Sequence, residues 1–218
     1  MRRKRKQNKH SRGYYNIDSL EITLNENGTL EEIFYLQDLK QRKIYLNCDI
    51  DQLAVSEVIR HILQFNKEDS EIPPEERKPI LLYVSSNGGE VDSGFELIDV
   101  IRISKTPVYT INLGYQYSMG FLIGLAGHKR FATLNAKYLM HDGSNFIYNS
   151  GAKAQDQMEF NRRVEERVKN YIISRSKLTR EEYDSKLRVE WYLFADEAKE
   201  KGFVDYIIGR DCTIAEII

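Results

Sequence analysis

Cysteine is scarce in this sequence of 218 residues, which contains only Cys48 and Cys212. Two cysteines form no disulfide framework, which is typical of a reducing compartment, so we expect a cytoplasmic protein. Neither cysteine stands in a metal-ligand spacing, and the four histidines are scattered along the chain. We therefore expect neither a metal nor another cofactor.

Long hydrophobic runs are also absent. The longest apolar stretch, from Phe121 to Gly127, is far too short to cross a bilayer. The formal net charge of −1 argues against a body that binds nucleic acid. Hydrophobic residues at 41% and charged residues at 30% are instead typical of a soluble globular protein with one large domain or two small ones.

The N-terminal residues carry a strong local excess of positive charge. Residues 1–13, MRRKRKQNKHSRG, include no acid and lack the apolar run of a secretory signal. We expect a disordered arm, which is either a solvated tail or a contact for an acidic partner or nucleic acid, and we favour the tail. Residues 14–41 alternate weakly and have a turn signal at Asn27-Gly28, which favours a hairpin.

Strands and helices alternate regularly from Arg42 onward. Short apolar and β-branched runs predict strands at 43–46, 80–84, 108–113, 137–140 and 203–208, and an aromatic run stands at 191–194. Helical spacing predicts helices at 53–65, from about 92, at 121–127, 153–174 and 195–201, and a capping pattern begins another at Thr179. This order implies right-handed crossovers and an α/β fold with a largely parallel sheet. The long amphipathic helix 153–174 is either an assembly surface or a packing helix.

Ser118 stands at the junction between a strand that begins at Val108 and the buried helix that begins near Phe121. Free backbone N–H groups at a helix N-terminus favour a developing negative charge. A serine at a strand-to-helix turn is a known arrangement for the nucleophile of acyl transfer. Serine is also a good helix cap, so the residue alone leaves both roles open.

A pair of glycines, Gly88 and Gly89, ends another predicted strand. Ligands in open α/β sheets bind outside the carboxyl ends of the strands, so we expect the pair and Ser118 to share one crevice. No Gly-Lys-Ser/Thr follows, which excludes a phosphate-binding loop. The pair is either an ordinary turn or, beside Ser118, part of an oxyanion hole formed by the N–H groups of Gly89 and Met119.

A serine nucleophile needs a base, and His141 is the candidate. It ends the strand that begins at Lys137, whose carboxyl end should face the same crevice. His10 lies in the basic arm and His128 in a polar turn. A histidine at a strand end is usually structural, so the role of His141 depends on its agreement with Ser118.

In this order and spacing, Gly88-Gly89, Ser118-Met119-Gly120, Met140-His141 and Phe194–Asp205 resemble the Clp protease proteolytic subunit (ClpP-like) family. The resemblance covers about residues 42–209, followed by a tail at 210–218. It implies a ClpP/crotonase-like fold with repeated β-α-β units and a late, long handle helix. It also implies a homo-oligomer of one or two stacked heptameric rings that degrades unfolded polypeptide supplied by an AAA+ ATPase unfoldase.

Matching positions assign roles within that resemblance. Ser118 is the expected nucleophile, His141 the base, and Gly89 and Met119 the oxyanion donors. The position of the family's acid is Glu190, whose longer side chain requires a shifted backbone. The remaining expected residues are the alternative acid, Asp184, and the substrate-binding residues Gly88, Glu90, Val91 and Gly143.

Several positions depart from the family pattern. Asn87 replaces a proline, Asp142-Gly143 replaces Gln-Pro, Tyr115 and Tyr117 replace small residues near the nucleophile, and Val189 replaces an arginine used between rings. These changes indicate a divergent member with an altered substrate cleft. We expect a serine endopeptidase; the alternatives are a non-catalytic ring subunit and a crotonase-type acyl-CoA enzyme, which uses an oxyanion hole without a Ser-His pair.

Overall fold

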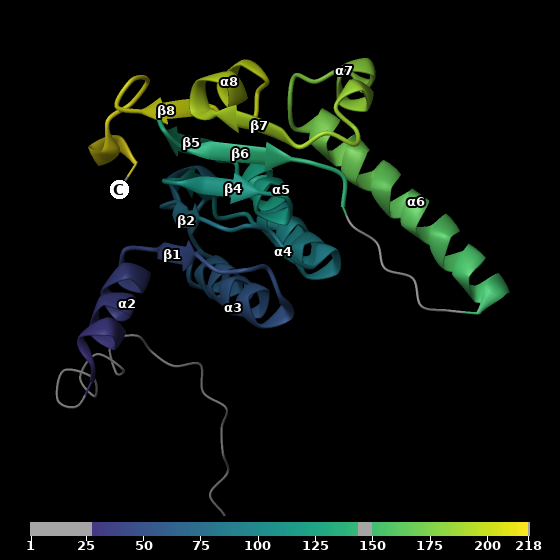
Figure 1. Ribbon diagram of the computed structural model, residues 1–218. Helices are drawn as coiled ribbons and strands as arrows, with labels where there is room; N and C mark the ends of the chain where they lie inside the picture. The colour runs from purple at the N-terminus through teal and green to yellow at the C-terminus, as the bar shows by residue number, and fades with distance from the viewer. Residues whose placement is uncertain (1–27, 144–149, 218) are drawn as a thin grey trace, which may run out of the picture. The chain divides into compact units, whose positions relative to one another are not determined.

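The computed structural model describes residues 28–143 and 150–217, and the chain divides into two units, Met1–Gln41 and Arg42–Ile218 (Figure 1). The basic arm at 1–13 lies outside the described residues. The two units are described separately below.

The described part of the first unit is the helix α2 (Leu30–Lys40). Thr29 caps this helix, because its hydroxyl accepts the Glu32 N–H at 3.2 Å while the Glu32 carboxylate accepts the Thr29 N–H at 2.8 Å. A hairpin strand within residues 30–40 was therefore a wrong prediction, since this local capping favours helix. Residues 14–27, the rest of the predicted hairpin, lie outside the described residues.

A parallel five-stranded sheet forms the centre of the second unit, in the order β1-β2-β3-β5-β8. All four strand pairs are parallel, which confirms the predicted α/β fold. The strands are β1 (Lys43–Leu46), β2 (Ile80–Val84), β3 (Val108–Asn112), β5 (Lys129–Thr133) and β8 (Tyr206–Ile208).

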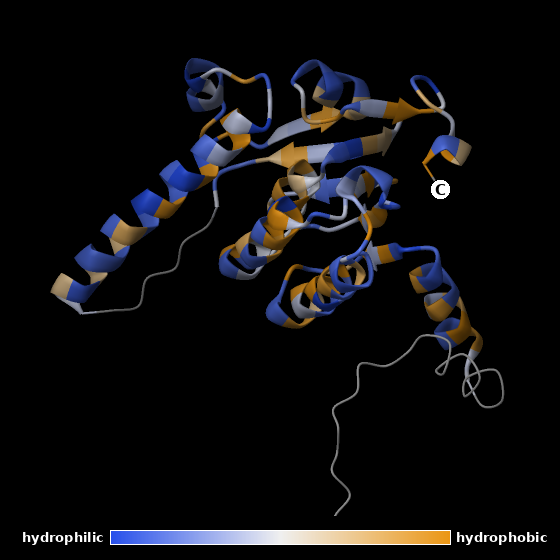
Figure 2. Cartoon of the chain, turned by 180° about the vertical axis from the view of Figure 1, so that it is seen from behind, coloured by the Kyte–Doolittle hydropathy of each residue, from blue (hydrophilic) through white to orange (hydrophobic). Residues whose placement is uncertain are grey.

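Three helices connect successive parts of this sheet and pack against one another: α3 (Gln52–Glu68), α4 (Val91–Ile103) and α5 (Met119–Ala126). All eight residues of α5 are buried, which explains its apolar sequence. Figure 2 shows strongly hydrophobic stretches on these three helices. This repeated β-α-β arrangement places the N-terminus of α5 near the carboxyl ends of the strands.

A second sheet has the order β4-β6-β7, from β4 (Tyr115–Tyr117), β6 (Lys137–Met140) and β7 (Trp191–Phe194). The β4–β6 pair is parallel and the β6–β7 pair is antiparallel. The strands β4, β5 and β7 were not predicted, and β7 had been noted only as an aromatic run. The polar start of β5 had suggested a turn, but the Arg130 guanidinium forms a two-point ion pair with Asp205, with distances of 3.0 and 2.6 Å. That pair allows a charged residue within a strand.

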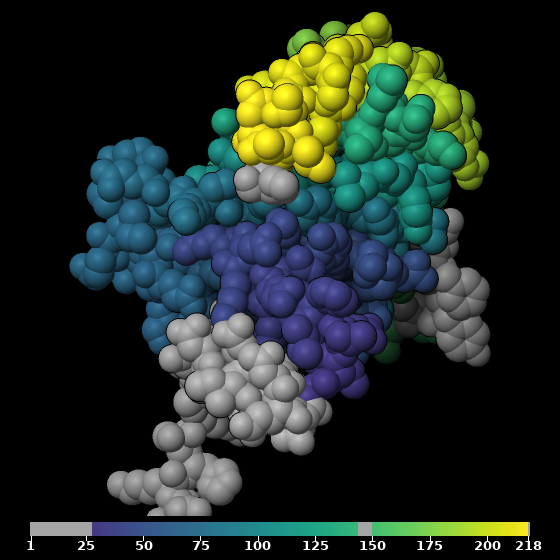
Figure 3. Space-filling view, turned by 90° about the vertical axis from the view of Figure 1, so that its left-hand side faces the viewer, coloured from purple at the N-terminus to yellow at the C-terminus, as the bar shows by residue number. Residues whose placement is uncertain are grey.

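The last third of the unit contains α6 (Gly151–Ser174), α7 (Arg180–Ser185) and α8 (Ala195–Glu200). The long helix α6 buries only Tyr171 and Ile172, and Figure 2 shows it as mainly hydrophilic. Two short 3-10 helices complete the chain, η1 (Pro74–Glu76) and η2 (Ile214–Glu216). Residues 210–217, predicted as a tail, fold back onto the unit (Figure 3), and Ile217 packs against Leu81, Ile111 and Phe131.

An ion pair near the start of the second unit supports a stability prediction. The buried Asp69 carboxylate accepts hydrogen bonds from Arg42 at 2.7 and 2.6 Å and from the Thr106 hydroxyl at 2.8 Å. The bonds to Arg42 hold the pKa of Asp69 below its usual range. The carboxylate therefore stabilises the fold at neutral pH, and this stabilisation is lost as the pH falls through the lowered folded-state pKa.

We expect Asp69→Asn to lower the free energy of unfolding by about 3 kcal/mol at pH 7, because it leaves a partly buried guanidinium without its charge partner. In urea titrations the difference in unfolding free energy from wild type should narrow as the pH falls below about 4, where the aspartate of the unfolded chain becomes protonated, and should vanish below the lowered folded-state pKa. Glu166→Gln is the control, because its ion pair with Arg180 is half exposed on both sides and should contribute little. Equal effects of the two substitutions would contradict the assignment.

Candidate active site

Ser118 has an unusual backbone conformation, with φ of 51° and ψ of −119°. A positive φ is strained for a residue with a side chain, and such strain is found where a nucleophile sits on a sharp strand-to-helix turn. The Ser118 hydroxyl makes no capping hydrogen bond to α5. The capping role is therefore not what the structure shows, and the hydroxyl is not engaged by its own helix.

Hydrogen bonds to β6 and to the segment that follows β2 fix this strained turn. The Ser118 N–H donates to the Leu139 carbonyl at 3.0 Å, and the Tyr117 N–H donates to the Ser86 carbonyl at 2.9 Å. The Ser118 carbonyl in turn accepts the N–H of Leu122 in α5 at 3.2 Å. The surrounding segments thus determine the conformation of the turn more strongly than its own preference does.

Gly88 lies directly against the Ser118 turn. A Cβ added at Gly88 would lie 2.7 Å from the Ser118 Cβ and 2.9 Å from the Met119 nitrogen, and Gly88 has φ of +105°. Only glycine fits this position without moving the serine. The structure therefore brings the glycine pair and Ser118 together.

Gly89 pairs with Ile50 in a short parallel bridge. Its bonds run from the Ile50 N–H to the Gly88 carbonyl and from the Glu90 N–H to the Ile50 carbonyl, both at 2.8 Å. In a parallel bridge the flanking residues make the bonds, so the Gly89 N–H points away from Ile50. Within residues 28–143 and 150–217, neither this N–H nor that of Met119, the first residue of α5, donates to a protein acceptor. Two donors are thus available near Ser118.

His141 follows directly after β6 and is half buried. Tyr117 of β4 pairs with Leu139 of β6, which places the end of β6 beside the Ser118 turn. In the described part of the chain, however, the His141 ring has no hydrogen bond to the Ser118 hydroxyl or to a carboxylate. The structure therefore places His141 just after the neighbouring strand β6, without a hydrogen bond between His141 and Ser118.

The two candidate acids have different surroundings. In the antiparallel β6–β7 pair Met140 lies opposite Trp191, so continuing the register by one residue places His141 opposite Glu190. Glu190 is exposed, and its Oε2 accepts the Tyr192 hydroxyl at 3.1 Å. Asp184, on α7, instead forms an ion pair with Lys169 of α6. Register therefore favours Glu190.

The other predicted substrate-binding residues lie at the start of α4 and after β6. The Glu90 carboxylate accepts the Ser93 hydroxyl at 2.7 Å, and Val91 is 38% exposed. A Cβ at Gly143 would meet no atom within 4 Å. These positions are open enough for contact with a substrate, but no direct observation assigns them that role.

Tyrosines next to the turn form a cluster that the sequence did not reveal. The Tyr117 ring lies 5.2 Å from that of Tyr115 and 5.9 Å from that of Tyr192, the latter at 90°. The sequence signal that could have indicated Tyr192 was the alternation of Glu190, Tyr192 and Phe194, because alternate residues of a strand share one face. Tyr192 is thus an additional residue of the site.

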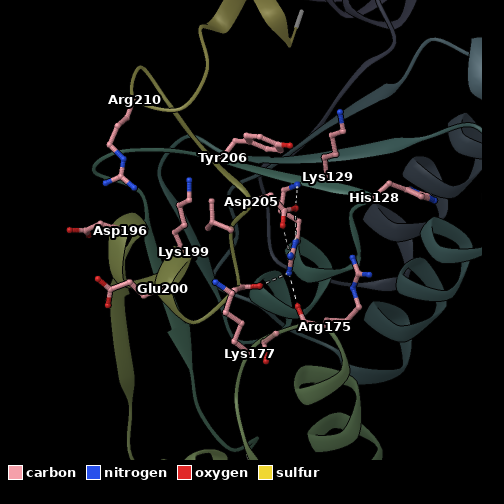
Figure 4. Close-up of a pocket in the computed structure, with 14 residues that line it drawn as sticks. His128, Lys129, Arg175, Lys177, Asp196, Lys199, Glu200, Asp205, Tyr206 and Arg210 are labelled. Carbon is pink, nitrogen blue, oxygen red and sulfur yellow. Dashed lines mark hydrogen bonds and ion pairs between the residues drawn. The ribbon is translucent and has the colours of Figure 1, made fainter.

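A separate pocket of about 780 Å³ lies among β5, β8, α8 and the end of α6 (Figure 4). Several of its cations already have partners: Arg130 binds Asp205, Lys199 binds Asp211, and Arg175 donates to the carbonyls of Leu125 in α5 and of Gly127 just after it. Ser118 does not line it. We interpret it as a structural cluster that ties these elements together.

His128, also at this pocket, accepts the Val108 N–H at Nδ1 over 3.0 Å, and burial lowers its pKa. In the described residues no three histidine, cysteine or acidic side chains converge as metal ligands. A search of the same residues finds no helix that combines the length and apolar character of a membrane span.

The parallel β-α-β sheet, its small companion sheet and the strained serine at the start of a buried helix are consistent with an α/β protein of the ClpP/crotonase fold. The family model described as Clp protease matches residues 27–211. The chain therefore belongs to the Clp protease family, which confirms the resemblance seen in its motifs.

Three relatives share about a third of the aligned residues. ATP-dependent Clp protease proteolytic subunit 2 of Treponema pallidum is 29% identical over 182 residues, which cover 83% of this chain and 88% of that protein. Proteolytic subunit 1 of Streptomyces avermitilis is 34% identical over 178 residues. Proteolytic subunit 3 of Streptomyces coelicolor is 33% identical over 178 residues. In both Streptomyces comparisons the match covers 79% of this chain and 77% of the relative.

We predict that Gly88→Ala lowers kcat/KM for a short fluorogenic peptide by roughly a hundredfold, the effect of a displacement of about 1 Å at a reacting group. The added methyl group would push on Ser118 and would strain a backbone with positive φ. Gly151→Ala is the control, because a Cβ there meets nothing within 4 Å. Unchanged cleavage by the Gly88 variant would show that the Ser118 position is not critical.

Proposed function

We propose that this chain is a serine endopeptidase that cleaves unfolded polypeptides or peptides through Ser118, His141 and Glu190. The observation that carries the proposal is the strained Ser118 turn. Its hydroxyl makes no cap bond, and beside it two N–H groups have no acceptor among the residues that the structure describes. A structural serine needs neither feature. Membership of the Clp protease family supports the same conclusion.

The proposed reaction begins when Ser118 Oγ attacks the carbonyl carbon of the scissile peptide bond. His141 accepts the hydroxyl proton, and the N–H groups of Gly89 and Met119 donate to the oxyanion that forms. Collapse of this intermediate breaks the C–N bond, and the imidazolium gives its proton to the leaving amine. Water then hydrolyses the acyl-enzyme by the same proton transfers, which regenerates Ser118.

His141 must form a hydrogen bond to Ser118 for this sequence of steps. Catalytic hydrogen bonds are often long or poorly aligned before substrate binds and tighten in the complex. The neighbouring strand positions of Tyr117 and Leu139 keep the histidine within reach of the turn. Substrate binding is therefore the proposed step that aligns the pair.

A non-catalytic ring subunit is the second candidate. The observation that favours it is the missing bond between His141 and Ser118 within the described residues. The two candidates differ in one property, the reactivity of the serine.

Ser118→Ala should abolish cleavage of a fluorogenic peptide, with a loss of at least about a thousandfold, because no other group replaces the nucleophile. Ser185→Ala on α7 is the matched control, since Ser185 is exposed and its hydroxyl bonds only within its own helix. Cleavage that survives in the Ser118 variant would remove this serine from the mechanism. A wild-type chain without activity would favour the non-catalytic subunit.

The acid is tested by a pair of substitutions. Glu190→Gln should lower kcat by roughly a thousandfold or more, because the carboxylate that orients His141 and stabilises the imidazolium is lost. Glu190→Asp keeps the charge and should lose less. Asp184→Asn should leave kcat nearly unchanged, since Asp184 is paired with Lys169. The reverse pattern would transfer the role to Asp184.

Assembly into an oligomeric ring, supplied by an ATPase, is also part of the proposal. The exposed helix α6 carries Met158 and Phe160, which are 48% and 57% exposed. The relatives are named as proteolytic subunits of an ATP-dependent protease. Static light scattering at micromolar concentration should give several times the mass of one chain, 25.6 kDa, and a monomer at that concentration would contradict a ring.

A further inference from the structure

Tyr192 connects the proposed acid with the residue that precedes the nucleophile. Its hydroxyl donates to Glu190 Oε2 at 3.1 Å, and its ring packs edge-on against the Tyr117 ring, with centroids 5.9 Å apart. The strand register explains this contact, because Tyr117, Leu139 and Tyr192 lie in one row across β4, β6 and β7.

Glu190 lies two residues before Tyr192 and His141 two residues after Leu139, and both therefore lie on the same face of the sheet. Alternate residues along a strand share a face, so Glu190 lies on the side of Tyr192, and His141 lies on the side of Leu139. Continuing the β6–β7 register by one residue beyond the Met140–Trp191 pair places these two residues opposite each other. Tyr192 is therefore in reach of a carboxylate that also neighbours the proposed base.

An exposed glutamate depends more than an aspartate does on a neighbour that fixes the direction of its carboxylate. Its side chain has one more rotatable bond, and ordering that bond costs conformational entropy. A carboxylate has two oxygens that accept hydrogen bonds. The Tyr192 hydroxyl bonds to Oε2, which leaves Oε1 to accept the ring N–H of His141.

The protonation of Tyr192 fits this arrangement. Its hydrogen bond to Glu190 raises the pKa of the Tyr192 hydroxyl, so the group remains a proton donor over the neutral pH range. Because the ring contact with Tyr117 restricts the tyrosine, the hydroxyl is presented to Glu190 from a defined direction.

We propose that Tyr192 is a positioning residue of the peptidase: its hydroxyl fixes one oxygen of Glu190 so that the other can orient His141, and Tyr117 fixes the Tyr192 ring. This inference rests on the proposed function. It also gives a role to Tyr117, because that ring links the proposed acid to the turn that holds Ser118.

Tyr192→Phe tests the inference, because it keeps the ring and removes only the hydroxyl. We expect kcat for a fluorogenic peptide to fall roughly tenfold, the scale of one hydrogen bond to a charged group, while KM stays near the wild-type value. Tyr206→Phe is the matched control: this tyrosine is 38% exposed and stacks on Phe131 in the other sheet, and its loss of a hydroxyl should leave kcat unchanged.

A double-mutant cycle separates positioning from a structural role. In a Glu190→Gln background, adding Tyr192→Phe should cause little further loss, because the group that the hydroxyl orients has already changed. Full wild-type kcat in Tyr192→Phe, or an equal loss with and without the Glu190 carboxylate, would overturn the inference while leaving the peptidase intact. A wild-type chain with no Ser118-dependent cleavage would overturn the proposed function and this inference together.

Discussion

The strained conformation of Ser118 is the constraint on which the site depends. A positive φ at a serine persists only where the surroundings impose it. Here the hydrogen bonds of Tyr117 and Ser118 tie the turn to the segment after β2 and to β6. The same conformation starts α5 at Met119 and leaves its first N–H groups without helical partners. Gly88 completes the arrangement, because any side chain there would occupy the space of the serine.

Much of this arrangement was predictable from the sequence. Apolar runs identified the strands from Lys43, Ile80 and Val108, and two glycines at a strand end placed a close backbone approach at the same edge as Ser118. The strand β5 was not predicted because the partner of Arg130 is Asp205, 75 residues away. The local pattern of apolar and polar residues does not reveal such a distant pair. The helix α2 was mistaken for a hairpin strand although its capping residues were visible.

The proposed catalytic acid shows how strand register adds to what the sequence indicates. Spacing alone left Glu190 and Asp184 as alternatives. The antiparallel β6–β7 register, continued by one residue, brings Glu190 opposite His141. Asp184 instead forms an ion pair with Lys169. The same register brings Tyr192 between Glu190 and Tyr117. Contacts of this kind depend on which strands become neighbours, which a single sequence does not state.

The central claim is that the strained turn makes the Ser118 hydroxyl a nucleophile. The most direct measurement is reaction of the wild-type chain with a fluorophosphonate, followed by peptide mass spectrometry to locate the adduct. This account predicts one covalent adduct per chain on the peptide that contains Ser118, and none after denaturation of the protein before reaction. An unmodified chain, or an adduct on another serine, would contradict it.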